Sequence, residues 1–237
     1  SPALQALVAG YEKLVAPLAS RPVGRVAQPL PNASADGACN LPPGELVADA
    51  QLAATEAPPF GGAQMAFMNR GGVRNPGFVP KGEGIVTYGE AFTVQPFGNS
   101  LVTLTLSGQQ LKDVLEQQFA GCRGQSASAT RLLVPSRGVK IGWDGAQACG
   151  ERIRSVSLTR NGRTETLVAD GRVAEPQRAW RVTVNSFLAS GGDSFTTFAQ
   201  GREPLGGALD LDALVDYLGR FQATPWRTGG AAEDGGT

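Results

Sequence analysis

The stretch WRVTVNSFLASGGD, residues 180–193, decides the fold because it joins a strand to a glycine-rich polar loop. Trp180–Val184 alternates as a half-buried strand does. The loop that follows presents the aromatic ring of Phe187, the pair Gly191-Gly192 and the carboxylate of Asp193. A carboxylate accepts two hydrogen bonds from vicinal hydroxyls such as those of a ribose. The alternative is that Asp193 forms an Asx turn or a helix cap leading into Phe195.

A second loop of the same design, NRGGVR at residues 69–74, follows the predicted strand Ala63–Met68. Glycines permit positive φ and the close approach of a ligand, and the guanidinium of Arg74 matches the oxygens of a phosphate or carboxylate. We therefore expect a ligand here too. The alternative is a tight turn in which Asn69 caps the backbone and Arg74 is solvated.

Phe97 lies between Pro96 and Gly98, and this setting favours a partly exposed ring. Exposed aromatic rings serve as stacking platforms for bases, each worth about 1–3 kcal/mol. The alternative is a core phenylalanine, which is the commoner case. Phe97 and Phe187 on separate glycine loops favour a slot that holds a base between two rings, although sequence alone does not show that they face each other.

The rest of the chain divides into helices and short strands. Helices are predicted over Pro2–Leu18, Pro43–Ala54, Gly108–Phe119 with Ser107 as its N-cap, and Asp210–Phe221. Strands are predicted over Arg21–Leu30 at an edge, Ala63–Met68, Leu101–Leu106, Val139–Trp143, Ile153–Thr159, Thr164–Val168 and Trp180–Val184. Ile85–Thr87 with Tyr88 and Glu90 indicates a further strand and turn. This order predicts an α+β fold, in which sheets pack between helices.

The composition limits the function. The 237 residues include no histidine, and 21 Lys and Arg balance 21 Asp and Glu. The missing histidine excludes Ser-His-Asp, Cys-His and His-rich metal routes to catalysis within this chain. Zero net charge gives no electrostatic footprint for a nucleic-acid polymer, but a single nucleotide needs only one or two placed cations. No apolar run reaches the roughly 18 residues that span a bilayer. From the length of 237 residues we expect one large globular domain with frayed ends.

Cys39, Cys122 and Cys149 match no zinc spacing and no Cys-x-x-Cys motif. Either Cys122 and Cys149 form a disulfide, as in an exported protein, or the three cysteines are reduced and some are buried. Ser1 opens directly into a helix without the charge pattern of a signal peptide, which predicts a mature or truncated fragment. Residues 228–237 are Gly, Ala and acid, and are expected to be disordered.

Five ordered motifs resemble the C-terminal, substrate-specificity domain of the 5′-nucleotidase, UDP-sugar hydrolase and 2′,3′-cyclic phosphodiesterase family. They are GELVADA (44–50), NRGGVR (69–74), QPFGNSL (95–101), LSGQQL (106–111) with Leu115-Glu116, and NSFLASGGD (185–193). Together they cover about Leu4 to Phe221, and their compatible order argues against a chance match.

The resemblance implies a four-layer α/β/β/α nucleotide-binding domain at residues 21–227. A connecting helix at residues 1–20, through which one domain rotates against another, precedes it, and the tail at 228–237 follows. It also implies the roles of six residues: Phe97 and Phe187 stack on either side of the base, Asn69 and Asn99 contact the base or ribose, Arg74 pairs with the phosphate, and Asp193 holds the ribose hydroxyls.

The catalytic apparatus of the family lies elsewhere. Its two divalent metal ions and its His-Asp pair belong to an N-terminal metallophosphatase domain of the same polypeptide. The resemblance therefore implies that this chain holds no catalytic residue, metal or cofactor of its own, and that the protein is extracytoplasmic: secreted, in the cell wall or periplasmic.

Three positions depart from the family pattern. Arg70 stands where relatives often carry a small residue, and could reach a phosphate or lie in solvent. The segment Ser34-Ala35-Asp36-Gly37 supplies no further phosphate arginine. Arg137 is unexpected, and the sequence assigns it no role.

Two functions of different classes are compatible with these residues. The first is the substrate-binding domain of a metal-dependent nucleotide phosphohydrolase, inactive without its catalytic domain. The second is a standalone, noncatalytic module that binds a nucleotide or nucleoside. The coding sequence upstream of Ser1 separates them, because several hundred residues with Asp-x-His and Asn-His-Asp/Glu metal motifs favour the enzyme.

Overall fold

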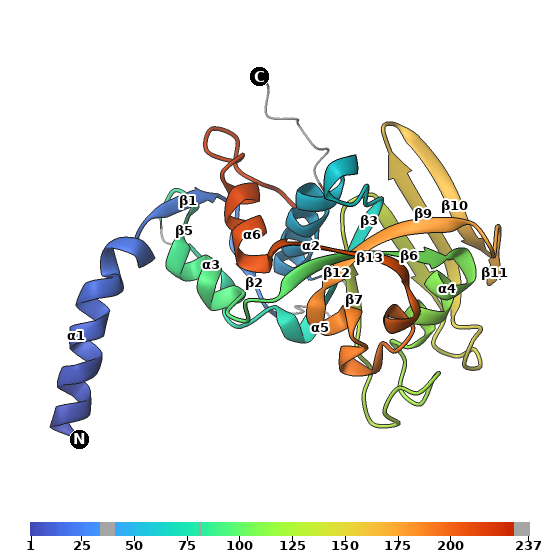
Figure 1. Ribbon diagram of the computed structural model, residues 1–237, viewed down its shortest axis with the longest axis horizontal. Helices are drawn as coiled ribbons and strands as arrows, with labels where there is room; N and C mark the ends of the chain where they lie inside the picture. Colours follow the sequence, from blue (N-terminus) through green and yellow to red (C-terminus); the bar gives the residue numbers. More distant parts are fainter. Residues whose placement is uncertain (34–40, 81, 230–237) are drawn as a thin grey trace.

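The computed structural model describes residues 1–33, 41–80 and 82–229. Its central element is a five-stranded sheet in the order β13-β6-β12-β3-β7 (Figure 1). Strands β3 (Met65–Asn69) and β12 (Ala179–Asn185) run parallel, with Val182 opposite Met65. The antiparallel strands are β6 (Ser100–Ser107), β7 (Leu133–Pro135) and β13 (Arg202–Leu209). Because β3 and β12 are parallel neighbours, the loops that follow them leave the sheet at the same edge.

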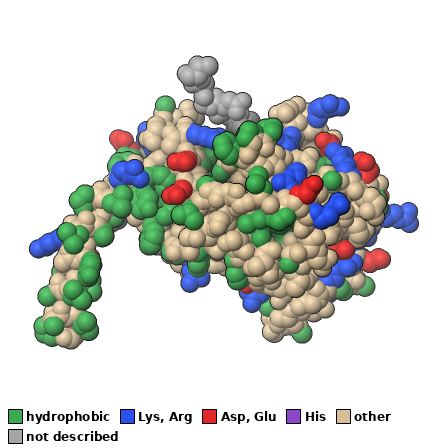
Figure 2. All heavy atoms as spheres, viewed as in Figure 1, with side chains coloured by type: hydrophobic (Ala, Val, Ile, Leu, Met, Phe, Trp, Pro, Cys, Tyr) green, Lys and Arg blue, Asp and Glu red, His purple; other side chains and the backbone are tan. Residues whose placement is uncertain are grey.

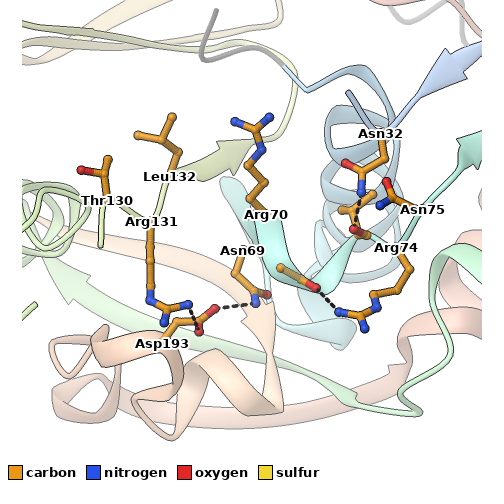
Figure 3. Close-up of a pocket in the computed structure, with 11 residues that line it drawn as sticks. Asn32, Asn69, Arg70, Arg74, Asn75, Thr130, Arg131, Leu132 and Asp193 are labelled. Atoms are coloured by element: carbon orange, nitrogen blue, oxygen red, sulfur yellow. Dashed lines mark hydrogen bonds and ion pairs between the residues drawn. The ribbon is translucent and has the colours of Figure 1, made fainter. Parts of the chain in front are cut away.

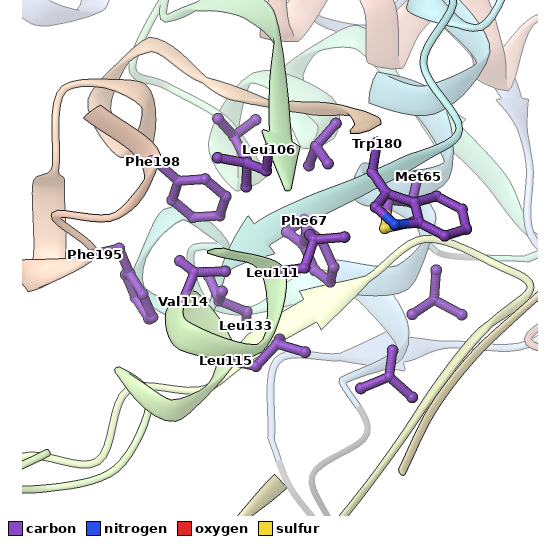
Figure 4. Packing of buried hydrophobic residues seen from close by; sticks show 14 of the residues in the cluster. Met65, Phe67, Leu106, Leu111, Val114, Leu115, Leu133, Trp180, Phe195 and Phe198 are labelled. Carbon is purple, nitrogen blue, oxygen red and sulfur yellow. The ribbon is translucent and has the colours of Figure 1, made fainter. Parts of the chain in front are cut away.

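A second, four-stranded sheet has the order β11-β10-β9-β8. Its strands are β8 (Val139–Trp143), β9 (Ile153–Arg160), β10 (Arg163–Ala169) and β11 (Arg172–Val173). Helix α4 (Gly108–Glu116) contacts both sheets. A hydrophobic cluster joins α4 to the two sheets (Figure 4), and includes Met65, Phe67, Leu106, Leu111, Leu115, Val156, Leu158, Trp180, Phe195 and Phe198.

Three helices belong to a second hydrophobic cluster: α2 (Pro42–Thr55), α3 (Tyr88–Val94) and α6 (Asp210–Leu218). Helix α2 packs on β3 and on α6, and α6 also contacts β13. Short strands complete this side, with β1 (Pro22–Arg25) paired to β5 (Ile85–Thr87) and β2 (Leu30–Pro31) paired to β4 (Gly77–Phe78). Two sheets combined with helices confirm the predicted α+β fold, a mixture of helices and sheets.

Most predicted elements are present, with shifted ends. Helix α4 stops at Glu116, three residues before the predicted end. Two short strands, β1 and β2, replace the single strand predicted over Arg21–Leu30, and β2 ends one residue beyond it. The predicted strand Ile85–Thr87 is confirmed as β5, but the predicted turn at Tyr88 and Glu90 is wrong, because Tyr88–Val94 is helical. Its cause is a capping box, in which Thr87 Oγ1 accepts from the Glu90 N–H and Glu90 Oε2 accepts from the Thr87 N–H.

Helix α1 (Pro2–Ala19) confirms the predicted N-terminal helix, and it extends away from the rest of the molecule (Figures 1 and 2). None of its residues is buried, and its apolar side chains are more than half exposed, namely Leu4, Leu7, Val8, Tyr11, Leu14, Val15 and Leu18. Just beyond its C-terminal end, the Arg21 guanidinium lies 5.4 Å from the centre of the Tyr88 ring. The connecting role of α1 stays a prediction. No helix in the described ranges is long and apolar enough to cross a membrane.

Cys122 and Cys149 form a disulfide with a Cα–Cα distance of 5.3 Å, so the first of the two cysteine alternatives is confirmed. It ties the segment after α4 to the loop between β8 and β9. Cys39, the segment 34–37 and the tail from residue 230 lie outside the described residues.

Arg137 belongs to a polar cluster with Asp49 of α2 and Tyr217 of α6. Its backbone N–H donates to Asp49 Oδ1 at 2.6 Å, and its guanidinium lies 3.1 Å from Asp49 Oδ2 and donates to the Tyr217 hydroxyl. Burial raises the pKa of Asp49 to about 6, against the opposing charge of Arg137, and burial also raises the pKa of the nearby Glu45. Arg137 therefore has a structural role, as the partner of a buried carboxylate.

The Asp49 carboxylate predicts a pH dependence of stability. Its folded-state pKa lies above the ordinary value of 3.8, so the fold favours the protonated form, and this stabilisation is lost as pH rises from 4 through about 6. Wild type should lose on the order of 2 kcal/mol of unfolding free energy relative to Asp49→Asn over that range. Denaturant unfolding of both proteins between pH 4 and 7.5 measures the difference; parallel pH profiles would contradict the assignment.

Loss of the disulfide should destabilise the fold. The bridge closes a loop with a sequence separation of 27, for which loop-closure entropy predicts about 3.5 kcal/mol. We expect Cys149→Ser and reduced wild type to melt at the same lowered temperature. Reductant should leave the melting of Cys149→Ser unchanged, and a further decrease in that variant would mean that another bridge is present.

Candidate functional site

The two glycine loops meet where β3 and β12 end. Asn69 is the last residue of β3 and Asn185 the last of β12. Asn185 Nδ2 donates to Asn69 Oδ1 at 3.0 Å, and Asn69 Nδ2 donates to Asp193 Oδ2 at 2.9 Å. Both asparagines are buried, and Asn185 Oδ1 accepts from the Leu188 N–H at 2.8 Å. This chain of hydrogen bonds holds the second loop against the first.

Asp193 adopts the left-handed backbone conformation, with φ 54° and ψ 24°. Asp tolerates this region better than most residues other than Gly. Its Oδ1 accepts from Arg131 Nη1 at 2.8 Å, and its backbone carbonyl accepts from Gln125 Nε2 at 3.0 Å. The side-chain bonds therefore all lead to distant parts of the chain, and the alternative of an Asx turn or helix cap is wrong.

A cavity of about 550 Å³ opens between these loops (Figure 3). Arg131 and Asn69 point toward Asp193 from two sides, while Arg70 points away from it. The cavity wall contains three of the six predicted site residues, Asn69, Arg74 and Asp193. The other lining residues are Asn32, Arg70, Gly71, Val73, Asn75, Thr130, Arg131 and Leu132. Three arginines and one carboxylate thus share one polar cavity.

Arg74 connects the cavity to Phe97. Its guanidinium carbon lies 5.6 Å from the centre of the Phe97 ring, and its Nη1 donates to the Gly71 carbonyl at 3.4 Å. The Arg74 backbone N–H donates to the Val94 carbonyl at 3.0 Å. The Arg74 side chain is exposed to solvent, as the alternative predicted, and the Phe97 ring and the Gly71 carbonyl also contact it.

Phe97 and Phe187 are 47% and 45% exposed, so the core alternative for Phe97 is wrong. Neither ring lines the cavity, and within the described residues the two rings do not contact each other. A Cβ at Gly192 would lie 2.6 Å from three atoms of the Phe187 ring, which shows how closely that ring covers the glycine. The Phe187 ring thus lies beside Asp193, at the margin of the site.

Asn99 connects the two phenylalanine segments. Its Oδ1 accepts from Ser186 Oγ at 3.4 Å, and its Nδ2 donates to Asp210 Oδ2 at 3.2 Å. Burial raises the pKa of Asp210, and the hydrogen bond from Asn99 opposes that shift. Asn99 does not line the cavity; in this structure it joins the segment that follows Phe97 to the segment that carries Phe187.

Sequence reasoning missed Arg131, Gln125 and Asn185 as site residues. Asn185 had a detectable signal, because it ends a strand before a glycine loop just as Asn69 does. Arg131 and Gln125 had none, since residues 120–132 show no regular pattern and Asp193 lies 62 and 68 residues away from them. No group of three or more Cys, Asp or Glu in residues 1–33, 41–80 and 82–229 is arranged to hold a metal ion.

Comparisons with known proteins identify the family of this chain. Residues 22–200 match the model of the family described as 5′-nucleotidase, C-terminal domain. Snake venom 5′-nucleotidase of Macrovipera lebetinus is 29% identical over 190 residues, 78% of this chain and 44% of the relative. Endonuclease YhcR of Bacillus subtilis is 29% identical over 219 residues, 91% of this chain and 15% of the relative.

Among solved structures, the 5′-nucleotidase precursor from Thermus thermophilus superimposes with a TM-score of 0.74 at 28% identity. The match covers 96% of this chain and 42% of that one, so the chain spans less than half the length of these relatives. The family match extends over both glycine loops and the strands that precede them. The chain belongs to the 5′-nucleotidase C-terminal domain family.

Proposed function

We propose that this chain binds a nucleotide where its two glycine loops meet, and that it positions the phosphate ester for hydrolysis by a separate N-terminal metallophosphatase domain. One observation carries the proposal: Asn69, Arg74 and Asp193 line a single cavity, and two exposed phenylalanines adjoin its lining residues. Phe97 contacts the lining residue Arg74, and Phe187 covers Gly192, which precedes the lining residue Asp193.

Each group has a chemistry suited to one part of a nucleotide. Each Asp193 oxygen already accepts one protein donor, from Arg131 or Asn69, which leaves capacity on both oxygens for two vicinal hydroxyls. The Arg74 guanidinium suits phosphate oxygens. The exposed rings of Phe97 and Phe187 suit the faces of a base, with Asn69 and Asn99 beside the base or ribose.

Binding of this kind contributes to catalysis by orientation. A substrate held at its base, ribose and phosphate presents its ester bond in one geometry, which removes part of the entropic barrier. By the family resemblance, two divalent metal ions of the other domain supply the activated water and the polarised phosphate. The described residues of this chain do not fit such a metal pair, so they act on the substrate by binding alone.

We also propose an extracytoplasmic location and a connecting role for α1. The Cys122–Cys149 disulfide supports the location, because such bridges persist in oxidising compartments. The exposed apolar side chains of α1 and its attachment near α3 support the connecting role. In that role the helix joins this domain to the catalytic domain.

Truncation of the site should weaken nucleotide binding. Phe187→Ala removes a stacking face, worth roughly 1–3 kcal/mol, and should raise the Kd for AMP by about tenfold. Asp193→Ala should weaken binding by a similar factor. Phe60→Ala is the matched control, since Phe60 is 63% exposed and precedes the opposite end of β3. Calorimetric titration with AMP measures all four proteins, and equal affinities would contradict the site.

The chain alone should hydrolyse nothing. With AMP and added Mg²⁺, Mn²⁺ or Zn²⁺, phosphate release by the pure chain should equal that of buffer, because no described cluster holds the metals. Metal-dependent release that persists through purification would refute this division of labour. A colorimetric phosphate assay over several hours is sufficient.

A further inference from the structure

Arg131 is a cavity residue to which the family resemblance assigns no role. Its Nη1 donates to Asp193 Oδ1 at 2.8 Å, and this ion pair has a half-exposed arginine and a largely buried carboxylate. The other guanidinium N–H groups of Arg131 make no hydrogen bond within the described residues, and the side chain lies at the cavity wall. Its one fixed contact is therefore with the carboxylate proposed to hold the ribose.

The segment that carries Arg131 is anchored along its length. The Arg131 backbone N–H donates to the Gln118 carbonyl at 2.8 Å. Gln125 is buried, and its Nε2 donates both to the Gln117 carbonyl at 2.9 Å and to the Asp193 carbonyl at 3.0 Å. The disulfide at Cys122 ties the segment to the loop between β8 and β9. The guanidinium thus extends from a fixed base to Asp193.

Two vicinal hydroxyls need both carboxylate oxygens in one plane and one orientation. Asn69 holds only Oδ2 and Arg131 holds only Oδ1, so loss of either donor leaves the carboxylate held at one oxygen, and rotation about its last bond becomes easier. A single hydroxyl needs only one oxygen and tolerates that rotation. The contribution of Arg131 therefore depends on whether the ligand has one hydroxyl or two.

We infer that Arg131 is a specificity-determining residue, which positions the Asp193 carboxylate so that the site selects ribonucleotides over 2′-deoxy and 3′-deoxy nucleotides. This inference rests on the proposed nucleotide site and adds to it the sugar class and the residue that selects it. Arg131 acts through Asp193, and no step of bond breaking involves it.

Arg70 provides a matched control. It lines the same cavity and carries the same charge, yet its guanidinium makes no hydrogen bond or ion pair within the described residues. Removing the charge of Arg70 should weaken the binding of every nucleoside monophosphate by the same factor. Removing the charge of Arg131 should change the preference among sugars.

In the test, isotopically labelled chain is titrated with AMP, 2′-deoxy-AMP and 3′-deoxy-AMP. Binding of each ligand is followed by the change in amide chemical shifts. The three ligands have the same charge, so phosphate attraction cancels in the ratio of their Kd values. Wild type should prefer AMP about tenfold over each deoxy ligand, the value of one hydrogen bond to a charged acceptor. Arg131→Gln should reduce the preference to about threefold or less through weaker AMP binding, with the affinity for deoxy ligands nearly unchanged. Arg131→Lys should recover part of the preference, and Arg70→Gln should retain all of it.

The outcomes separate the two claims. If wild type binds AMP at Phe187 but Arg131→Gln and Arg131→Lys keep the full preference, the inference fails and the nucleotide site stands. Tighter AMP binding by Arg131→Gln would also overturn the inference, because it would make Arg131 a competitor of the ribose. If wild type shows no saturable shift with any ligand, the nucleotide site fails and the inference with it. Amide spectra and melting temperatures of each variant show that the fold is intact.

Discussion

The parallel pairing of β3 with β12 is the constraint on which the site depends. It places Asn69 and Asn185, at the ends of two neighbouring strands, within hydrogen-bonding distance of each other. Two loops whose asparagines are 116 residues apart in the chain are thereby joined at one edge of the central sheet. Both amides are buried, so leaving either unpaired would cost about 1–3 kcal/mol. The hydrogen bonds that satisfy them also orient Asp193, and stability and site geometry therefore have a common cause.

Charge in the site is balanced only in part. Asp193 is paired with Arg131, while Arg74 is held by Phe97 and the Gly71 carbonyl, and the Arg70 guanidinium is without a protein partner among the described residues. The cavity thus keeps an excess of positive charge although the whole chain is neutral. Such an arrangement suits a small anion bound together with a polyhydroxyl group better than it suits a polymer. The proposed nucleotide site is therefore compatible with a chain that contains no histidine.

Local chemistry explains what could be predicted from sequence. Strand alternation, glycine loops and the capping residue Ser107 are signals within a few residues, and they located β3, β12, α4 and both loops. The helix at Tyr88 was missed because its capping box follows directly on a strand, and β13 because its residues are exposed and include Gly206 and Gly207. Arg131 and Asp193 are 62 residues apart in the sequence and meet only through tertiary packing, so no local pattern predicts their ion pair. Asn99 lay in a recognisable motif, yet its contacts with Asp210 and Ser186 depend on the assembled fold.

A crystal structure of the chain grown with AMP tests the central claim, that the two loops form one nucleotide site, most directly. The account predicts the ribose hydroxyls on the two oxygens of Asp193, the phosphate toward Arg74, and the base against the rings of Phe97 and Phe187. Arg131 should still donate to Asp193 in that complex. A nucleotide bound elsewhere, for example beside Arg160 and Arg163 in the cavity of the β9–β10 hairpin, with the loops that follow β3 and β12 empty, would contradict it.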